Sequence, residues 1–327
     1  MKQILLSILI ISSLAANVFA QGFLSLDSAV ERAITHNYDI KIAGVSNEIA
    51  ATNNTLGNAG LLPNINGVGS ISQGFANTRL VTADGKTTDR NSAKNLAYSG
   101  GINAGYTLYA GGKAWILRKE LGRNVDLASA QFRVQLQSSI SAVIQAYAAV
   151  VNAQRQTVAL DTAISLAKAR MDLSKAKYDI GTDAKVDYLQ GRVDYNAARS
   201  ARLGQNASLA AAFASLNDLM GDDVESEYSV ADSLDVNLIL TPADSSLLIS
   251  RNPALEVQKI NEEISQLDLK IAKTNYLPSV TANLAYNYSR TQSDASLLLS
   301  NRSIGPSGGL GINVPIFQGG NIRRQAK

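Results

Sequence analysis

Apolar and polar residues alternate along three segments of the chain, and this pattern predicts β-strands. The apolar positions are Ile102, Ala104, Tyr106 and Leu108; Val280, Ala282, Leu284, Tyr286 and Tyr288; and Leu310, Ile312, Val314 and Ile316. A period of two places apolar side chains on one face of a strand and polar side chains on the other. The sequence therefore predicts a sheet with one apolar face.

A second pattern, with steps of three or four residues, lies between the first and second of these segments. Its apolar positions are Phe132, Leu136, Ile140, Val143, Tyr147, Val150, Ala153, Leu160, Ile164, Ala167 and Met171. The mean step is close to the coiled-coil value of about 3.5. Because Arg123 to Ile180 contains neither Gly nor Pro, we predict one helix from Lys113 to Tyr178, about 100 Å long at 1.5 Å per residue.

The helical pattern turns back between Tyr178 and Asp187. Gly181 can adopt the left-handed conformation that ends a helix, and Thr182 or Asp183 can cap the next one. The return helix is predicted from Ala184 to Met220. Its predicted buried side consists of Val186, Leu189, Val193, Ala197, Leu203, Leu209, Phe213 and Leu216. The sequence therefore predicts a long antiparallel helical hairpin.

Two parts of the chain are copies of one another. Residues 37–63 align without a gap on residues 252–278, at a constant offset of 215 positions, and residues 108–112 align on residues 316–320 at an offset of 208. The chain is therefore a duplicated unit of about 210 residues. The alignment makes residues 64–76 a strand, although Ile65, Val68 and Ile71 are out of phase.

Each copy is expected to contain a helix, a β-hairpin and the start of a longer helix. The first helix is predicted from about Leu26 to Gly57, with Asp27 or Ser28 as its cap. The hairpins are predicted at residues 61–110 and 278–317, with polar loops at about 75–97 and 290–302. Because the second copy stops seven residues after Gly320, we expect it to be incomplete.

The first twenty residues are predicted to be a signal peptide. Lys2 precedes the apolar segment Ile4–Ile11, and Val18-Phe19-Ala20 forms a small-residue cleavage site. The apolar core of about eight residues is too short to span a bilayer, which takes roughly 20. The exported chain offers no later run of 18 apolar residues, so a membrane-embedded part has to be β-structure.

The composition favours a non-catalytic, exported framework. The chain has no Cys and one His, so we expect no disulfide, metal site, cofactor or enzymatic activity. The net charge of +3 with 17% charged residues gives no reason to expect nucleic acid as a partner. Four strands cannot close a barrel, and an open edge cannot face lipid, so several chains would have to share one barrel.

These motifs, in their order and spacing, resemble TolC-like outer-membrane efflux proteins (the outer-membrane factor family) over the whole mature chain. The residues that carry the resemblance are Leu24–Val30, Asn37 with Ile40, Leu62-Pro63, Leu277-Pro278, Tyr109–Gly112, Phe317–Gly320, and Tyr178 and Gly181 with Val186-Asp187. The resemblance implies an α+β membrane protein, in which a homotrimer forms one 12-stranded β-barrel continued by a periplasmic α-helical tunnel.

The resemblance also implies a function. It is that of a passive exit duct for efflux or type I secretion, set in the lipid of a Gram-negative-type outer membrane and extending into the periplasm. Its partners would be a periplasmic adaptor protein and an inner-membrane pump or transporter, which dock at the helical tip.

Several residues take roles in this interpretation. Candidates for the tip and gate are Tyr178, Gly181, Asp183, Lys185 and Asp187; strands start after Pro63 and Pro278; strand-to-helix turns use Gly111, Gly112, Gly319 and Gly320; and aromatic side chains at the membrane interface are Tyr106, Tyr109, Trp115, Tyr286, Tyr288 and Phe317. In the family, a carboxylate matching Asp187 helps to hold the periplasmic entrance closed, with partner groups expected in a second helical hairpin. From the residues alone, Asp183 and Asp187 are better explained as first-turn acids that the helix dipole favours. For Asp187, the resemblance favours the role at the entrance instead.

The predicted organisation has four parts: a signal peptide at 1–20, a first structural repeat at 21–220 that includes the helical hairpin 113–220, an equatorial connector at 221–242, and an incomplete second repeat at 243–327. One alternative is a periplasmic coiled-coil adaptor or scaffold, which would have one helical hairpin flanked by compact β-domains and no duplicated long strands. Another is a non-functional channel fragment.

Overall fold

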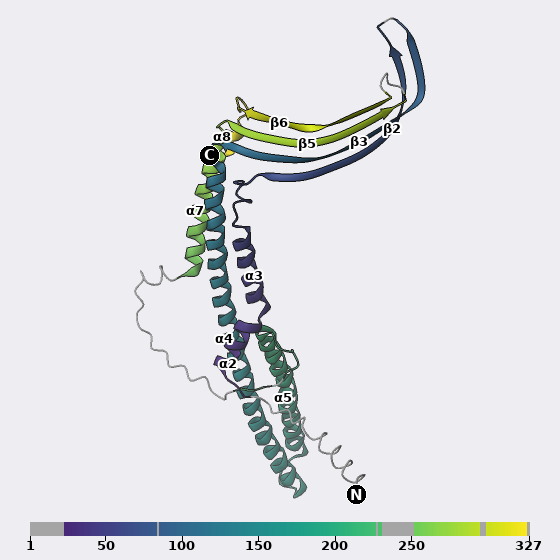
Figure 1. Cartoon of the computed structure of the whole chain (residues 1–327). Helices are drawn as coiled ribbons and strands as arrows, with labels where there is room; N and C mark the ends of the chain where they lie inside the picture. Colours follow the sequence, from purple (N-terminus) through teal and green to yellow (C-terminus); the bar gives the residue numbers. More distant parts are fainter. Residues whose placement is uncertain (1–22, 84, 227, 231–251, 295–298, 326–327) are drawn as a thin grey trace, which may run out of the picture. The chain divides into compact units, whose positions relative to one another are not determined.

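The computed structural model describes residues 23–325, apart from 84, 227, 231–251 and 295–298 (Figure 1). The predicted signal peptide and much of the predicted connector lie outside the described residues. The chain divides into two compact units, one of Met1–Val45 with Gln131–Pro253 and one of Ser46–Ala130 with Ala254–Lys327. The second unit thus contains the β-hairpins of both sequence copies.

The first unit is built on helices. Its elements are α2 (Leu26–His36), the start of α3 (Tyr38–Asn53), most of α4 (Lys113–Asp179), α5 (Lys185–Met220), and the short parallel pair β1 (Phe23–Leu24) and β4 (Ser229–Val230). Its core gathers Leu24, Ala29, Ala33, Val143, Tyr147, Val150, Val151, Leu216, Met220 and Val230. The hydroxyl of Tyr147 donates to the carbonyl of Leu24 at 3.0 Å, so the one polar atom of this buried ring has a partner.

The predicted stripe on α4 is confirmed, because every one of its positions is buried or half-buried. The predicted buried side of α5 is right only near its C-terminal end, at Leu209, Phe213 and Leu216. Val186, Leu189, Val193, Ala197 and Leu203 are exposed instead.

A different face of α5 lies against α4. A Cβ on Gly191 would lie 3.1 Å from the Cα of Met171, so the two helix backbones approach closely there. Farther along, Arg202 binds Asp161 at 2.8 Å, and Gln205 donates to the carbonyl of Ala153 at 3.0 Å. The contact therefore uses small and polar residues, which leaves the apolar stripe of α5 free.

The predicted first helix is in fact two helices. Asn37 has a non-helical ψ of 129° and separates α2 from α3. The cap of α2 is Ser25, whose hydroxyl accepts from the backbone N–H of Ser28 at 3.2 Å, so the predicted caps Asp27 and Ser28 were wrong. The second helix also ends earlier than predicted, at Asn53.

The second unit centres on a four-stranded antiparallel sheet, shown at the top of Figure 1. The strands are β2 (Asn64–Val81), β3 (Thr87–Ala110), β5 (Ser279–Ser293) and β6 (Ser300–Asn313), in the order β2-β3-β5-β6. The helices α7 (Pro253–Thr274) and α8 (Asn321–Gln325) belong to the same unit.

The strands of the first hairpin are longer than predicted, and its loop is shorter. Its strands run through most of the predicted loop at 75–97, and only residues 82–86 separate them. Polar residues occupy both faces of this extension, so no alternation marked it in the sequence. In the second hairpin the predicted strand to Ile316 was wrong, since β6 ends at Asn313.

The two hairpins have the same register. Asn64 pairs with Gly105 in the first hairpin; their counterparts at the offsets of 215 and 208, Ser279 and Asn313, pair in the second. The sequence repeat is therefore also a repeat of hydrogen-bonded strand geometry.

Candidate functional site

The sheet of the second unit has two chemically different faces. The register places Ile71, Tyr98, Ile102, Tyr286, Leu284, Ile304, Leu310 and Ile312 on one face. Asn66, Ser70, Asn103, Asn283, Asn287, Ser307 and Asn313 lie on the other. Most of the apolar face is solvent-exposed in the single chain. A sheet with one exposed apolar face is suited to contact lipid on that face and water on the other.

The two outer strands of this sheet are unpaired along one side. β2 pairs only with β3, and β6 pairs only with β5, among the described strands. Each outer strand is at least as long as the roughly 9–11 residues that a tilted strand needs to cross a bilayer. Backbone groups on such an edge need partners in a membrane, because lipid offers none.

A pair of glycines turns the chain from strand to helix in each copy. Gly111 and Gly112 have φ of 62° and 78°, and Gly319 and Gly320 have φ of 59° and 73°. All four are in the left-handed region, which other residues reach only at a cost. The helices α4 and α8 begin directly after these pairs, and β2 and β5 begin directly after Pro63 and Pro278.

The aromatic residues predicted at the membrane interface lie in different positions. Tyr106 and Tyr109 are near the end of β3, as predicted, and Trp115 is 67% exposed in the first turn of α4. Tyr286 and Tyr288 are inside β5 rather than near its end, because the strand continues to Ser293. Phe317 is 85% exposed beyond the end of β6.

The tip of the helical hairpin is a tight turn in the first unit. Gly181 has φ of 80°, its N–H donates to the carbonyl of Tyr178 at 3.0 Å, and Thr182 donates twice to the carbonyl of Lys177. The rings of Tyr178 and Tyr188 stack at 6.4 Å between centroids. These contacts fix the turn from both helices.

The charged side chains at the tip differ in their contacts. Asp183 forms an ion pair with Lys177 at 3.5 Å, and it is not a cap, because α5 starts after Ala184 without a side-chain hydrogen bond. Within the part of the chain that the structure describes, Lys185 and Asp187 have no ion pair or side-chain hydrogen bond. Both are exposed in the first turn of α5. These two groups are free to meet a partner.

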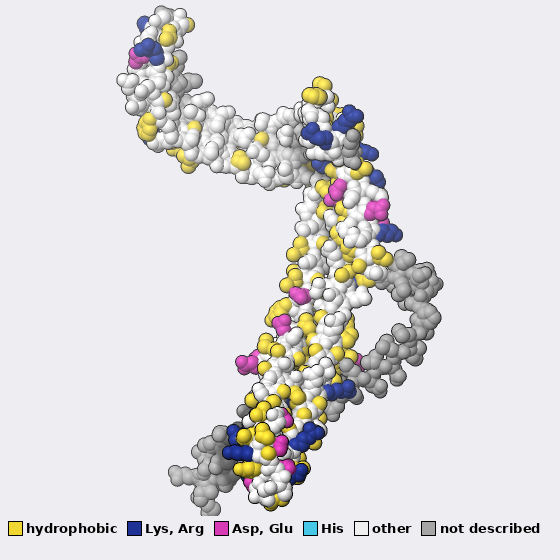
Figure 2. Space-filling model, turned by 180° about the vertical axis from the view of Figure 1, so that it is seen from behind, with side chains coloured by type: hydrophobic (Ala, Val, Ile, Leu, Met, Phe, Trp, Pro, Cys, Tyr) yellow, Lys and Arg dark blue, Asp and Glu magenta, His cyan; other side chains and the backbone are white. Residues whose placement is uncertain are grey.

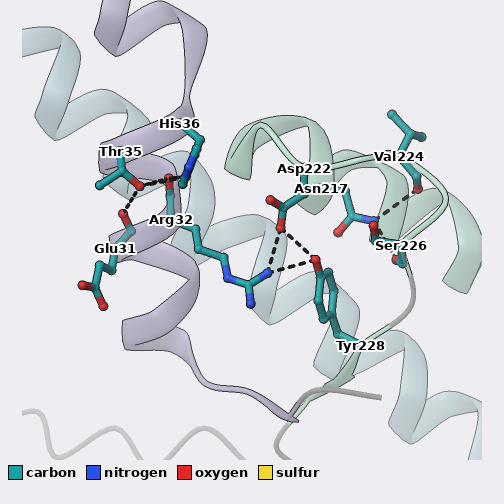
Figure 3. A network of polar contacts seen from close by, with 9 residues as sticks. All are labelled: Glu31, Arg32, Thr35, His36, Asn217, Asp222, Val224, Ser226 and Tyr228. Atoms are coloured by element: carbon teal, nitrogen blue, oxygen red, sulfur yellow. Dashed lines mark hydrogen bonds and ion pairs between the residues drawn. The ribbon is translucent and has the colours of Figure 1, made fainter. Parts of the chain in front are cut away.

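A polar network lies at the C-terminal end of α5, and no sequence motif predicts it (Figure 3). Arg32 donates to Asp222 and to the hydroxyl of Tyr228, both at 2.9 Å, and Tyr228 donates to Asp222 at 2.8 Å. The hydrogen bond to Asp222 raises the pKa of Arg32. Buried Asn217 donates to the carbonyls of Val224 and Ser226. These residues are far apart in sequence or belong to no motif, so only the fold brings them together.

Comparisons with known proteins agree with this geometry. TolC of Vibrio cholerae is 22% identical over 70% of this chain and 53% of its own length. The protease secretion protein PrtF of Dickeya chrysanthemi is 21% identical over 98% of this chain and 69% of its own. The CmeC outer membrane channel of Campylobacter jejuni has the same fold, with a TM-score of 0.72 and 21% identity over 92% of this chain and 63% of that chain.

A duplicated hairpin with a long helical hairpin is thus the fold of outer-membrane channel proteins. The chain belongs to the outer membrane efflux protein family, whose model matches residues 29–222. Like its relatives, it is a protein of the outer membrane that extends into the periplasm. The chain spans about half the length of TolC.

Proposed function

We propose that this protein forms a passive exit duct across the outer membrane, in which three copies share one 12-stranded β-barrel. The observation that carries the proposal is the four-stranded sheet, which exposes an apolar face and leaves both outer strands unpaired on one side. A closed ring of three such sheets would pair every edge, with the apolar face toward lipid and the polar face toward a water-filled lumen.

The helices of the first unit support the same assembly. Hydrophobic side chains remain visible along them in Figure 2. On α4, Val158, Leu166 and Leu173 are exposed at steps of seven or eight residues, which is close to a coiled-coil repeat. Together with the exposed stripe of α5, they would pack against helices of neighbouring copies and form a periplasmic tunnel.

The tip of the hairpin would be the periplasmic entrance. Exposed Lys185 and Asp187, with the exposed apolar side chains of Ile180 and Val186, offer both charge and apolar surface there. We propose that Asp187 takes part in holding the entrance closed, within a turn that Tyr178, Gly181 and Asp183 shape. An adaptor protein bound to an inner-membrane pump or transporter would dock at this tip. The duct itself would have no catalytic activity.

The alternative of a periplasmic adaptor fits the fold poorly, because an adaptor would lack two long hairpins joined in one sheet. The remaining alternative, a fragment without function, differs from the proposal in conductance. The full chain, extracted in detergent and added to planar bilayers, should give steady single-channel conductance. A soluble protein that never changes the bilayer current would overturn the proposal.

A further inference from the structure

The exit strand of the first hairpin continues beyond its own hairpin. β2 begins at Asn64, opposite Gly105, so the five residues 106–110 of β3 have no partner on β2. They are nevertheless part of the strand, because they pair with the first residues of β5: Tyr106 with Ala282, Tyr109 with Val280, and Ala110 with Ser279. A register shift lies between Thr107 and Tyr109.

The second hairpin has the same overhang without a partner. Asn313 lies opposite Ser279, the first residue of β5, so residues 314–318 extend past the hairpin as residues 106–110 do. They are not in a strand in the single chain. Two of their apolar side chains, Ile316 and Phe317, are 94% and 85% exposed. The overhang thus has the sequence pattern of a strand but lacks a neighbour to pair with.

We infer that residues 314–318 become strand by pairing with residues 64–67 of a second copy of this chain, in the register that β3 and β5 use within one chain. The inference rests on the proposed shared barrel and specifies how β6 of one copy pairs with β2 of the next. Adding 208 to a residue number in β3 gives the equivalent position in or after β6, and subtracting 215 from a residue number in β5 gives the equivalent position in β2. Applied to the β3·β5 pairs, these offsets place Leu310 opposite the second copy's Ile71 and Asn313 opposite its Val68. Beyond the register shift, Phe317 would lie opposite Ile65.

The chemistry of the two faces fits this register. Leu310 and Ile71 both lie on the apolar face of the sheet, whereas a slip of one residue would place Leu310 opposite Ser70 or Ser72 on the polar face. The ends of the strands also fit, since Ser300 at the start of β6 would lie opposite Val81 at the end of β2. Pro315 would lie beside the register shift, where a strand tolerates proline.

The glycine turns give a second, independent indication. A Cβ on Gly111 would lie 2.8 Å from Cδ1 of Leu277, so the turn of the first copy is closed by the segment that leads into β5. Gly319 has the same conformation but faces open space. The counterpart of Leu277 is Leu62, which is exposed. The second copy's Leu62 would close the turn at Gly319.

Disulfide formation between paired cysteines tests the register, because the chain has no Cys of its own. The two matched variants are Leu310→Cys with Ile71→Cys, and Asn313→Cys with Val68→Cys. The two cysteine pairs lie on opposite faces of the sheet. One of them is therefore at a non-hydrogen-bonded pair, the type of antiparallel pair in which the two side chains are closer. The controls, shifted by two residues, are Leu310→Cys with Gln73→Cys, and Asn313→Cys with Ser70→Cys. Direct partners have Cβ atoms about 4.5–5.5 Å apart. Diagonal partners lie about 7–8 Å apart, beyond the Cα separation of about 4.4–6.8 Å that a disulfide spans.

The full chain would be oxidised in outer membranes and analysed by non-reducing electrophoresis. We expect covalent dimers and trimers from at least one matched variant and none from the shifted controls. Cross-linking of the shifted controls alone would overturn the register but leave the shared barrel intact. If the chain conducts as a trimer and no variant cross-links, pairing of β2 with β6 is wrong. A chain that is monomeric and does not conduct would overturn the proposed function itself.

Discussion

The side chain of Asn37 forms hydrogen bonds to the end of α5 and to the start of α3, and its partner on α5 is Leu219, 182 residues away. Its Nδ2 donates to the carbonyl of Leu219 at 2.8 Å, in the last turn of α5. Its Oδ1 accepts from the N–H groups of Asp39 and Ile40, at 2.9 and 3.1 Å, in the first turn of α3. Both helix ends have backbone groups without partners inside the helix, and one buried amide satisfies groups of each.

Replacing this amide should destabilise the first unit. Asn37→Ala removes the cap of α3 and leaves the carbonyl of Leu219 without its partner, which should cost about 1–3 kcal/mol. Asn37→Ser keeps an acceptor for the N–H groups of α3 and removes the donor to Leu219 without burying a charge, so its loss of apparent melting temperature should be smaller. An Asn37→Ser variant as unstable as Asn37→Ala would show that the cap contributes nothing.

Gly221 should be the least replaceable of the left-handed glycines in the first unit. It has φ of 71°, and an added Cβ would lie 2.8 Å from the carbonyl oxygen of His36. Gly181, with φ of 80° and open space around it, is the matched control. Gly181→Ala should cost about 1–2 kcal/mol for backbone conformation alone, and Gly221→Ala should cost distinctly more because of the clash. Chemical denaturation of the two variants would measure the difference, and equal losses would contradict the packing at Gly221.

The stability of the second unit should depend on the charge of Glu120. Burial, and then the nearby carboxylate of Asp268, raise the pKa of Glu120. The folded state therefore favours the protonated form, so stability falls as pH rises from the ordinary pKa of Glu to the raised value, and the penalty is complete above it. Glu120→Gln should raise the apparent melting temperature at pH 8 and have little effect at pH 4.

Asp268→Asn serves as the companion variant, because it removes the smaller of the two causes. It should raise the melting temperature at pH 8 by less than Glu120→Gln does. A Glu120→Gln effect that is the same at pH 4 and pH 8 would mean that charge is not its cause.

The proposed gate is tested at the tip. Asp187→Asn removes a charge that is exposed and, among the described residues, unpaired, so we expect larger or more frequent openings in planar bilayers. Asp194→Asn is the control, since Asp194 is on the same helix and accepts a hydrogen bond from Gln190 at 2.9 Å. Identical conductance of the two variants would leave Asp187 as an ordinary first-turn acid.

The sequence predicted the parts of the fold that local pattern determines. The stripe from Phe132 to Met171, the turn at Gly181 and the paired glycines all follow from spacing or backbone conformation, and the repeat predicted β2 where alternation failed. Two of the wrong predictions, the buried side of α5 and the end of β6, share a different cause. Val186 and Leu203 are apolar but face away from α4, because Gly191 and Arg202 make the contact within the chain.

Residues 314–316 were predicted as strand for the same reason. An apolar pattern shows that a surface will be buried. It does not show whether the same chain or a second copy of the chain buries it. The network of Arg32, Asp222 and Tyr228 had no pattern at all, since it depends on contacts across about 190 residues of sequence.

The central claim, that several copies close one barrel, is tested most directly by the mass of the intact particle. Native mass spectrometry of the full chain released from detergent micelles should show one dominant species of three chains. A particle that contains a single chain would contradict the account, because the unpaired edges of β2 and β6 would then have no partner.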